Sequence, residues 1–246
     1  MLTSVKIILA STGSWLMLPL SAIQGLRLKR TAIRLPEAEG DRSGVCGTGK
    51  QLHLLAIGDS IIAGVGTVSM NRSLPVQFAA ALAYKLERSV HWRVEGRNGA
   101  DILLLQKQIK RLDGQQQADL ILISIGVNDV TGLSSKRHWA TQLEALTDSL
   151  RIKWPNACVI FIGLPPMGRF PLPPQPLSFT LGQRARVLDD ITASYIAKQV
   201  NMLHIPTKLE PAEQEFCEDG FHPSAQGCGA WATQLAEQLR SDNLAL

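Results

Sequence analysis

The chain has 246 residues, of which 45% are hydrophobic and 19% charged, the composition of a globular protein large enough to bury a sizeable core. Its formal net charge is +4, but five of the 25 basic residues and no acidic residue precede Glu37, which leaves 20 basic residues against 21 acidic ones in the rest of the chain. The body therefore carries no net basic charge, which argues against nucleic acid as a partner.

An uncharged, mostly apolar run, residues 7–26, dominates the N-terminus. Its length just reaches that of a membrane span, although Pro19 and several polar residues weaken it. Only Lys6 precedes the run and four basic residues follow it, a distribution that favours keeping the following segment on the cytoplasmic side. We therefore expect residues 1–33 to form a retained, membrane-associated leader with a cytoplasmic body. Cleavage as a signal peptide, followed by export, is the alternative.

Residues 34–50 are rich in turn formers and are expected to link the leader to one globular domain, residues 51–246. The linker contains GVCGTGK, which matches a phosphate-binding loop as far as its lysine, Lys50. Gln51 then occupies the position at which Ser or Thr would bind magnesium, and the stretch precedes a strand instead of following one. No nucleotide site is therefore expected here.

Apolar runs typical of buried strands alternate with amphipathic, helix-like segments through the domain. The expected strands are Leu52–Ile57, Val90–Val94, Leu120–Ile125, Val159–Ile162 and Met202–Ile205. The expected helices are Pro75–Arg88, Asp101–Leu112, Ser135–Lys153, Gln183–Gln199 and Ser224–Arg240. Such alternation predicts an α/β fold, a three-layer α/β/α sandwich with a central, mostly parallel, five-stranded sheet.

Reactive residue types follow several of these strands, at the edge of an open α/β sheet where ligands bind. The motifs are Gly58-Asp59-Ser60 after the first strand, Gly99 after the second, Gly126-Val127-Asn128-Asp129 after the third, and Asp219-Gly220-Phe221-His222 before the last helix. Each has a structural alternative. Ser60 and Asn128 could be helix caps, Asp59, Gly99 and Asp219 could be turn residues, and His222 could be an exposed histidine.

In this order the motifs resemble those of the SGNH hydrolases, also called the GDSL esterase and lipase family. The resemblance covers the chain from Leu52 to Leu239, and Ile61 replaces the leucine of the GDSL name. It implies a flavodoxin-like form of the α/β/α fold and hydrolysis of esters by a serine nucleophile. The leader and the linker lie outside the resemblance.

The same residues form a hydrolytic set on chemical grounds. A serine hydroxyl attacks an acyl carbon when a base takes its proton, and His222 is the candidate base for Ser60. Asp219, three residues before His222, can accept a hydrogen bond from its Nδ1 and stabilise the charged ring. The oxyanion would be held by the backbone N–H groups of Ser60 and Gly99 and by the side-chain amide of Asn128. This mechanism requires no cofactor and no metal ion.

The expected function is hydrolysis of small-molecule carboxylic esters through an acyl-enzyme intermediate, with short- to medium-chain acyl groups or lysophospholipids as substrates. The proline-rich stretch 163–182 should overhang the same sheet edge. Its apolar side chains are expected to line an acyl pocket: Met167, Phe170, Leu172, Leu177 and Phe179. The resemblance equally allows a thioesterase, a carbohydrate acetylesterase or an acyltransferase. Outside enzymes, the alternative is a non-catalytic, membrane-tethered binding protein.

Two acidic residues and the cysteines receive structural roles. Asp59 and Asp129 are expected to hydrogen-bond the loops that hold Ser60 and Asn128, with no part in proton transfer. The four cysteines, which lack the spacing of a zinc site, are Cys46, Cys158, Cys217 and Cys228. Cys217 and Cys228 flank the His222 motif and are expected as free thiols, with a disulfide between them as the alternative in an exported body.

Overall fold

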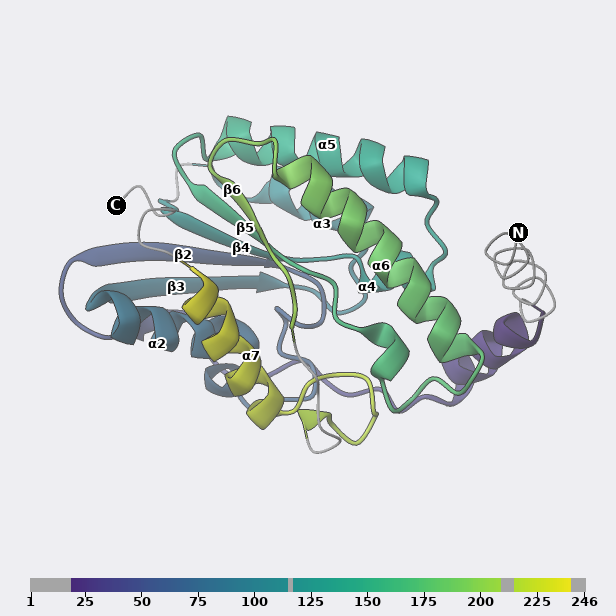
Figure 1. Cartoon of the computed structure of the whole chain (residues 1–246). Coiled ribbons are helices and arrows are strands. Elements are labelled where there is room, and N and C mark those ends of the chain that lie inside the picture. The colour runs from purple at the N-terminus through teal and green to yellow at the C-terminus, as the bar shows by residue number, and fades with distance from the viewer. Residues whose placement is uncertain (1–18, 115–116, 209–214, 240–246) are drawn as a thin grey trace, which may run out of the picture.

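The computed structural model describes residues 19–114, 117–208 and 215–239. They form three layers around a mostly parallel sheet of six strands in the order β1-β3-β2-β4-β5-β6 (Figure 1). The strands are β1 (Ser43–Cys46), β2 (Gln51–Gly58), β3 (Ser89–Gly96), β4 (Leu120–Ser124), β5 (Cys158–Ile162) and β6 (Met202–Ile205). The expected fold class is confirmed, with one strand more than the five that the sequence predicts.

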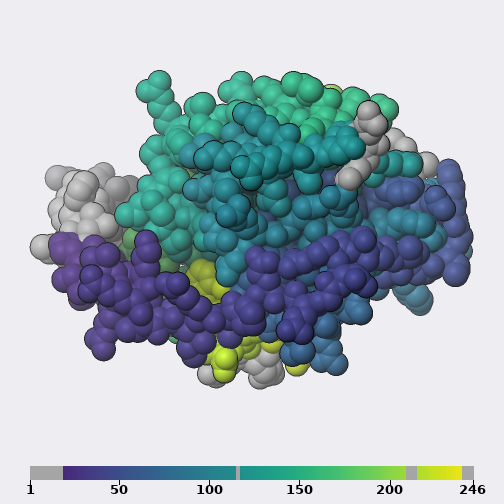
Figure 2. Space-filling view, turned by 180° about the vertical axis from the view of Figure 1, so that it is seen from behind, coloured from purple at the N-terminus to yellow at the C-terminus, as the bar shows by residue number. Residues whose placement is uncertain are grey.

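The additional strand, β1, lies in the segment expected to be a linker. It pairs antiparallel with β3 at the edge of the sheet. The residues before it also contact the body, since Ala38 is buried in the core and the Glu37 carboxylate accepts a hydrogen bond from the Asn98 N–H at 2.8 Å. Figure 2 shows this stretch (purple) lying along the rest of the chain. The expected linker is therefore packed against the domain for much of its length.

Helices cover both faces of the sheet (Figure 1). One face packs against α2 (Leu74–Leu86) and α7 (Ala225–Gln238). The other packs against α3 (Ile102–Arg111), α5 (Lys136–Lys153) and α6 (Leu177–Ile196). Every residue of β4 and β5 is buried, which explains why these central strands are nearly continuous apolar runs. Shorter elements are α4 (Val127–Thr131) and the 3₁₀ turns Met70–Arg72 and Met167–Arg169.

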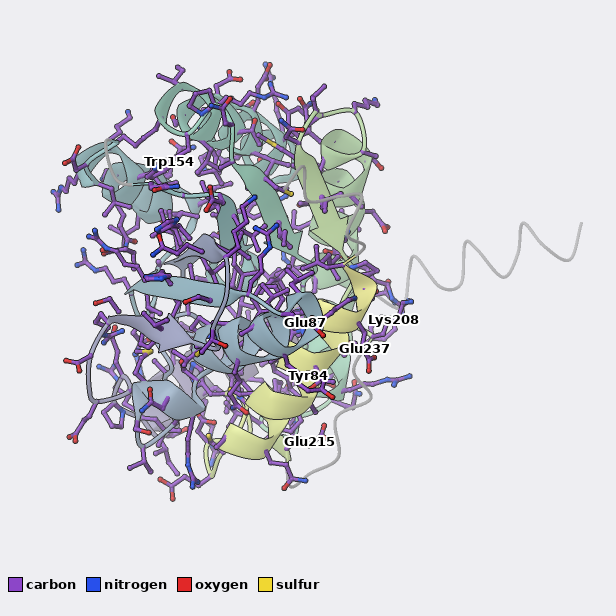
Figure 3. The ribbon with its side chains drawn as sticks, turned by 90° about the vertical axis from the view of Figure 1, so that its left-hand side faces the viewer. Tyr84, Glu87, Trp154, Lys208, Glu215 and Glu237 are labelled. Atoms are coloured by element: carbon purple, nitrogen blue, oxygen red, sulfur yellow. The ribbon has the colours of Figure 1, made fainter. Side chains whose placement is uncertain are left out.

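Helix α7 is fixed to its neighbour α2 at its C-terminal end. Lys85 Nζ donates hydrogen bonds to the carbonyl oxygens of Ala236 (2.8 Å) and Leu239 (2.6 Å) at the end of the helix, where carbonyl groups run out of i+4 partners. In Figure 3 this helix pair, marked by Tyr84 and Glu237, lies on one side of the sheet and Trp154 on the other. Because the His222 motif directly precedes α7, docking of this helix also sets the position of that motif.

The main difference from the expected elements concerns residues 163–182. Helix α6 begins at Leu177, six residues before the expected Gln183, so the loop is shorter than predicted. Gly182 lies within this helix, where its backbone packs directly on the 3₁₀ turn Met167–Arg169. A side chain would not fit there, because an added Cβ would lie 2.8 Å from the Gly168 Cα. The two glycines, which suggest a loop in the sequence, permit a close backbone contact instead.

The expected leader lies mostly outside the described residues. Of the apolar run 7–26, the structure describes residues 19–26, which belong to a helix spanning residues 19–31. Within the described part of the chain, no helix has both the length and the hydropathy that a membrane crossing requires.

Candidate active site

Three loops leave the sheet at one level of its carboxyl edge. In the sheet register, Gly58 at the end of β2 lies opposite Gly96 of β3 and Ser124 of β4. Neighbouring strands are about 4.8 Å apart, so the residues that follow them start from adjacent points. Gly96 allows the turn after β2 to cross directly over β3, because a Cβ at this position would lie 2.1 Å from the Ala63 nitrogen.

Ser60 lies in the turn directly after β2 and is 6% exposed. Its neighbour Asp59 holds this turn, because Asp59 Oδ1 accepts hydrogen bonds from the Ile61 N–H (3.1 Å) and the Ser124 hydroxyl (3.1 Å). The turn is thereby tied to the end of β4. No helix begins at Ser60, since α2 starts at Leu74, and the helix-cap alternative for this serine is therefore wrong.

The segment before α7 brings His222 to Ser60. His222 Nε2 lies 3.0 Å from Ser60 Oγ, and His222 Nδ1 lies 2.6 Å from Asp219 Oδ2. The other oxygen of Asp219 accepts hydrogen bonds from the backbone N–H groups of Phe221 and His222, both at 3.0 Å. One hydrogen-bonded chain therefore connects the carboxylate, the imidazole and the serine hydroxyl.

The protonation state of Asp219 follows from these contacts. Burial alone would raise the pKa of this carboxyl, but hydrogen bonds from the His222 ring and from two backbone N–H groups hold the pKa below its ordinary value. The turn that carries both residues is closed by Cys217. Its N–H donates to the His222 carbonyl (2.8 Å), and its carbonyl accepts from the Gly220 N–H (2.9 Å). An ionised carboxylate is thus held against the imidazole by backbone geometry.

Gly99 and Asn128, the other expected site residues, lie on the loops after β3 and β4. Gly99 has a φ of +76°, and an added Cβ would meet nothing within 4 Å, so its backbone borders open space. Asn128 Nδ2 donates to the Ala100 carbonyl at 2.8 Å, which joins the two loops and leaves the second amide hydrogen for another acceptor. Within the described residues, the N–H groups of Ser60 and Gly99 donate to no protein acceptor.

Asp129 strengthens the connection between these two loops. Its Oδ2 accepts a hydrogen bond from the Ile102 N–H (3.1 Å), and its Oδ1 accepts one from the Ser134 hydroxyl (3.1 Å). Burial raises the pKa of Asp129 to about 6, although both hydrogen bonds oppose the shift. Asp59 and Asp129 therefore anchor the loops on either side of the site, as the sequence predicts.

Burial of Asp59 has a measurable consequence for stability. It raises the pKa of this carboxyl from 3.8 to about 7, and Asp59 Oδ2 has no hydrogen-bond partner among the described residues. Between about pH 4 and pH 7 the folded protein therefore holds a proton that the unfolded chain has lost. The free energy of unfolding should fall as the pH rises through this range, by at most about 1.4 kcal/mol for each pH unit.

Asp59→Asn removes the titrating carboxyl group. The free energy of unfolding of this variant, relative to that of the parent, should therefore rise between about pH 4 and pH 7 and level off above pH 7. Urea unfolding at several pH values measures the difference. Asp148→Asn, a substitution of a surface aspartate on α5, is the matched control and should show no such trend. Parallel pH profiles for the parent and Asp59→Asn would contradict the assigned protonation state.

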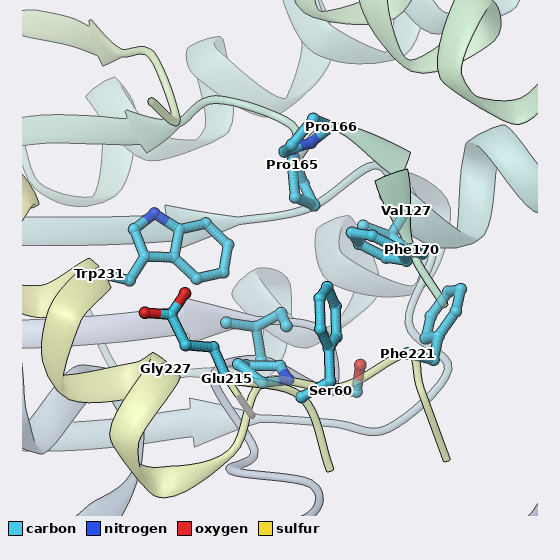
Figure 4. Close-up of a pocket in the computed structure, with 12 residues that line it drawn as sticks. Ser60, Val127, Pro165, Pro166, Phe170, Glu215, Phe221, Gly227 and Trp231 are labelled. Atoms are coloured by element: carbon cyan, nitrogen blue, oxygen red, sulfur yellow. The ribbon is translucent and has the colours of Figure 1, made fainter. Parts of the chain in front are cut away.

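A narrow, mostly apolar cavity of about 30 Å³ lies beside Ser60 (Figure 4). The loop after β5 contributes Pro165 and Phe170, and the segment around α7 contributes Trp231. Glu215 is the one charged residue among those that line the cavity. A volume of this size accommodates about two water-sized groups.

Of the five side chains expected to line an acyl pocket, Phe170 alone is among those that line this cavity. Met167 is fully buried in the core and Leu177 is buried on α6. Phe179 is 53% exposed on the first turn of α6, and the Leu172 N–H is bound to the Gly220 carbonyl at 3.1 Å. The expectation is confirmed for Phe170 and wrong for the other four; Leu177 and Phe179 belong to α6, which begins earlier than predicted.

Two histidines outside the site have acidic partners. His53 Nδ1 lies 3.1 Å from Asp119, and His204 Nε2 lies 2.8 Å from Asp189, which also accepts a hydrogen bond from the Leu164 N–H. Within residues 19–114, 117–208 and 215–239, no group of three His, Cys, Asp or Glu side chains is arranged to hold a metal ion. The four cysteines are free thiols.

A serine, a histidine and an aspartate in one hydrogen-bonded chain at the carboxyl edge of a sheet form a geometry that many hydrolases use. The sequence matches the GDSL-like Lipase/Acylhydrolase family over residues 56–230. The chain belongs to this family, and it is an ester-hydrolysing enzyme. No curated protein matches the sequence.

Several solved structures share the fold. A family 3 carbohydrate esterase of Clostridium thermocellum is 19% identical, with a TM-score of 0.62 over 76% of this chain and 94% of that one. The lipase Lip_vut3 from a goat rumen metagenome is 17% identical, with a TM-score of 0.60 over 76% and 96%. A variant of Axe2, an acetyl xylan esterase from Geobacillus stearothermophilus, is 20% identical, with a TM-score of 0.53 over 78% and 93%.

Proposed function

We propose that this enzyme hydrolyses esters of short, uncharged acyl groups, with Ser60 as the nucleophile and His222 and Asp219 as its base and partner. The observation that carries the proposal is the hydrogen-bonded chain from Asp219 through His222 to Ser60, with distances of 2.6 and 3.0 Å, beside a small apolar cavity. Such a chain activates a hydroxyl that is otherwise a weak nucleophile.

In the first step, Ser60 Oγ attacks the ester carbonyl carbon while its proton moves to His222 Nε2. The carbonyl oxygen becomes an oxyanion, which accepts hydrogen bonds from the Ser60 N–H, the Gly99 N–H and the Asn128 amide. His222 keeps its Nδ1 hydrogen bond to Asp219, which stabilises the imidazolium. The bond to the alcohol then breaks, its oxygen takes the proton from His222 Nε2, and the acyl group stays on Ser60.

In the second step, water takes the place of the alcohol. His222 Nε2 accepts a proton from this water as its oxygen attacks the acyl carbon, and the same three donors hold the second oxyanion. The bond to Ser60 Oγ breaks, the proton returns to this oxygen, and the carboxylic acid leaves. The cycle ends with the serine hydroxyl and the neutral imidazole restored.

The cavity favours the short end of the expected range of acyl groups. About 30 Å³ has room for the methyl group of an acetyl ester and little more. A longer chain would meet Trp231 and Pro165, whose side chains are buried in packed surroundings. An anionic acyl group would also meet the carboxylate of Glu215.

Hydrolysis rates for p-nitrophenyl acetate, butyrate, hexanoate and octanoate test this proposal, and kcat/KM should fall at each lengthening. Trp231→Leu should raise the ratio of the butyrate rate to the acetate rate by roughly tenfold, because each methylene group excluded from a pocket is worth about 1–3 kcal/mol. Trp154→Leu is the matched control, since Trp154 is equally buried but lies in the core of the other face. A parent enzyme that prefers octanoate would contradict the proposed acyl size.

A carbohydrate acetylesterase is the second candidate, and the size of the cavity favours it among the remaining activities. The structures that share the fold include a family 3 carbohydrate esterase and an acetyl xylan esterase. Release of acetate from acetylated xylan, compared with that from p-nitrophenyl acetate, tests whether a sugar is the preferred alcohol. We also propose that the leader associates with a membrane and that the enzyme domain lies on the cytoplasmic side. The hydrolysis assays do not test this separate proposal.

A further inference from the structure

The helix at residues 19–31 docks on the body through two polar side chains, Ser21 and Gln24, and through Leu28, which packs against the core. Ser21 Oγ lies 3.3 Å from Thr180 Oγ1 on α6. Gln24 donates from Nε2 to the Gln175 carbonyl (2.8 Å) and accepts from the Leu177 N–H through Oε1 (3.2 Å). These contacts recur at helical spacing and define the side of the helix that faces the protein.

The outward side of this helix carries large apolar side chains in its first two turns and basic ones toward its C-terminal end, which differs from the polar outer side of an ordinary surface helix. Ile23 and Leu26 are 63% and 61% exposed, and Ile33, just beyond the helix, is 54% exposed. Phe179 on α6 is 53% exposed and lies between Leu177 and Thr180, both of which contact the helix. We call Leu20, Ile23, Leu26, Ile33 and Phe179 the apolar face. Clustered exposure of large apolar side chains marks a contact surface.

Basic residues accompany the apolar face without acidic ones. Arg27, Lys29, Arg30 and Arg34 are all exposed, and the first acidic residue of the sequence is Glu37. The rest of the chain has nearly balanced charge, so the excess of positive charge lies in the N-terminal part of the chain. An apolar face flanked by arginine and lysine is the pattern of a helix that lies in the headgroup region of an anionic bilayer.

We infer that the helix at residues 19–31 lies on the surface of an anionic phospholipid bilayer, with the apolar face in the lipid and the four cations at the headgroups. This inference is independent of the proposed acyl specificity. It also differs from membrane spanning, since an interfacial helix needs one apolar side and no full crossing length.

The same contact would hold the active site near the lipid surface. The docked side of the helix contacts Gln175 and Leu177, at the end of the loop whose Pro165 and Phe170 line the cavity. Downstream of the helix, Glu37 binds the Asn98 N–H, one residue before Gly99. Figure 2 shows the N-terminal stretch (purple) beside a hollow in which the C-terminal segment (yellow) is visible. Esters that partition into the interface would thus be presented near Ser60.

Sedimentation of the full chain with lipid vesicles tests the inference. Ile23→Glu/Leu26→Glu should lower the partition coefficient for phosphatidylcholine vesicles that contain phosphatidylglycerol by at least about tenfold. Val68→Glu/Tyr84→Glu is the matched control, because these apolar residues are 84% and 91% exposed elsewhere on the body, and it should bind like the parent. Arg27→Gln and Arg30→Gln should each weaken binding about fivefold, and binding should decline with added salt.

A position-specific measurement separates this helix from the residues that precede it. A polarity-sensitive fluorophore on Leu26→Cys should shift to shorter wavelength on vesicles and be quenched by lipid-borne quenchers, whereas one on Val68→Cys should not respond. Hydrolysis of p-nitrophenyl acetate in solution should be unchanged in all variants, which verifies their folding. Equal vesicle binding by Ile23→Glu/Leu26→Glu and the parent would overturn the inference. A label at position 26 that shows neither a spectral shift nor quenching on vesicles would also overturn it.

Discussion

Ser60→Ala should lower kcat for p-nitrophenyl acetate by a factor on the order of 10⁴ to 10⁶, the loss expected when the nucleophile of such a group is removed. The reason is the position of its hydroxyl, 3.0 Å from His222 Nε2 and next to the loops of Gly99 and Asn128. His222→Ala should cause a loss of similar size, because the serine and the histidine act as one unit. Initial-rate kinetics with purified variants measure both effects.

Ser149→Ala is the matched control for the nucleophile. Ser149 lies on the exposed side of α5, and its hydroxyl donates within the same helix to the Ala145 carbonyl. This variant should keep full activity. Circular dichroism and thermal unfolding should show that Ser60→Ala folds like the parent, since its side chain is small and lies in a turn. Activity of Ser60→Ala within tenfold of the parent would disprove the role of this hydroxyl.

Asn128→Ala should lower kcat by about 10²–10³ with little change in KM, because the amide stabilises charge that develops only in the transition state. Nδ2 already donates one hydrogen to the Ala100 carbonyl at 2.8 Å, which orients the amide and leaves its other hydrogen for the oxyanion. Asn128→Asp should be at least as inactive, since a carboxylate repels the oxyanion. Separate determination of kcat and KM distinguishes this role from ground-state binding.

Asn98→Ala controls for general disturbance of these loops. Asn98 precedes Gly99, and its contact with Glu37 uses the backbone N–H, which alanine retains. Its kcat should stay within a few-fold of the parent. If Asn128→Ala raised KM and left kcat unchanged, the amide would be a substrate contact and not an oxyanion donor.

Most of the fold follows from local patterns in the sequence. β5 is an uninterrupted apolar run and β4 is apolar up to its last residue, Ser124. Helices α3, α5 and α7 begin directly after capping residues that the sequence marks: Asp101, Ser135 and Ser224. β1 could not be predicted in this way, because the strand Ser43–Cys46 is short, half exposed and surrounded by turn formers. Its strand conformation depends on pairing with β3, a long-range contact without a local signal.

The candidate site was predictable where chemistry and spacing coincide. Asp219 and His222 are three residues apart, and a short turn suffices to join them. The cavity was not predictable, because its walls come from segments that are distant in sequence. Trp231 is one apolar residue of an ordinary amphipathic helix, and only the docking of α7 places it beside Ser60. Phe179 was expected in a loop beside the site, because Gly182 suggests a loop in the sequence. Both residues lie within helix α6.

Reaction with a fluorophosphonate tests the central claim most directly, since phosphorus attaches to an activated serine oxygen as fluoride leaves. Intact mass spectrometry of the parent should show one adduct, peptide mapping should place it on Ser60, and p-nitrophenyl acetate should slow its formation. His222→Ala should react far more slowly. An adduct on another residue, or none on the folded and active protein, would contradict the account.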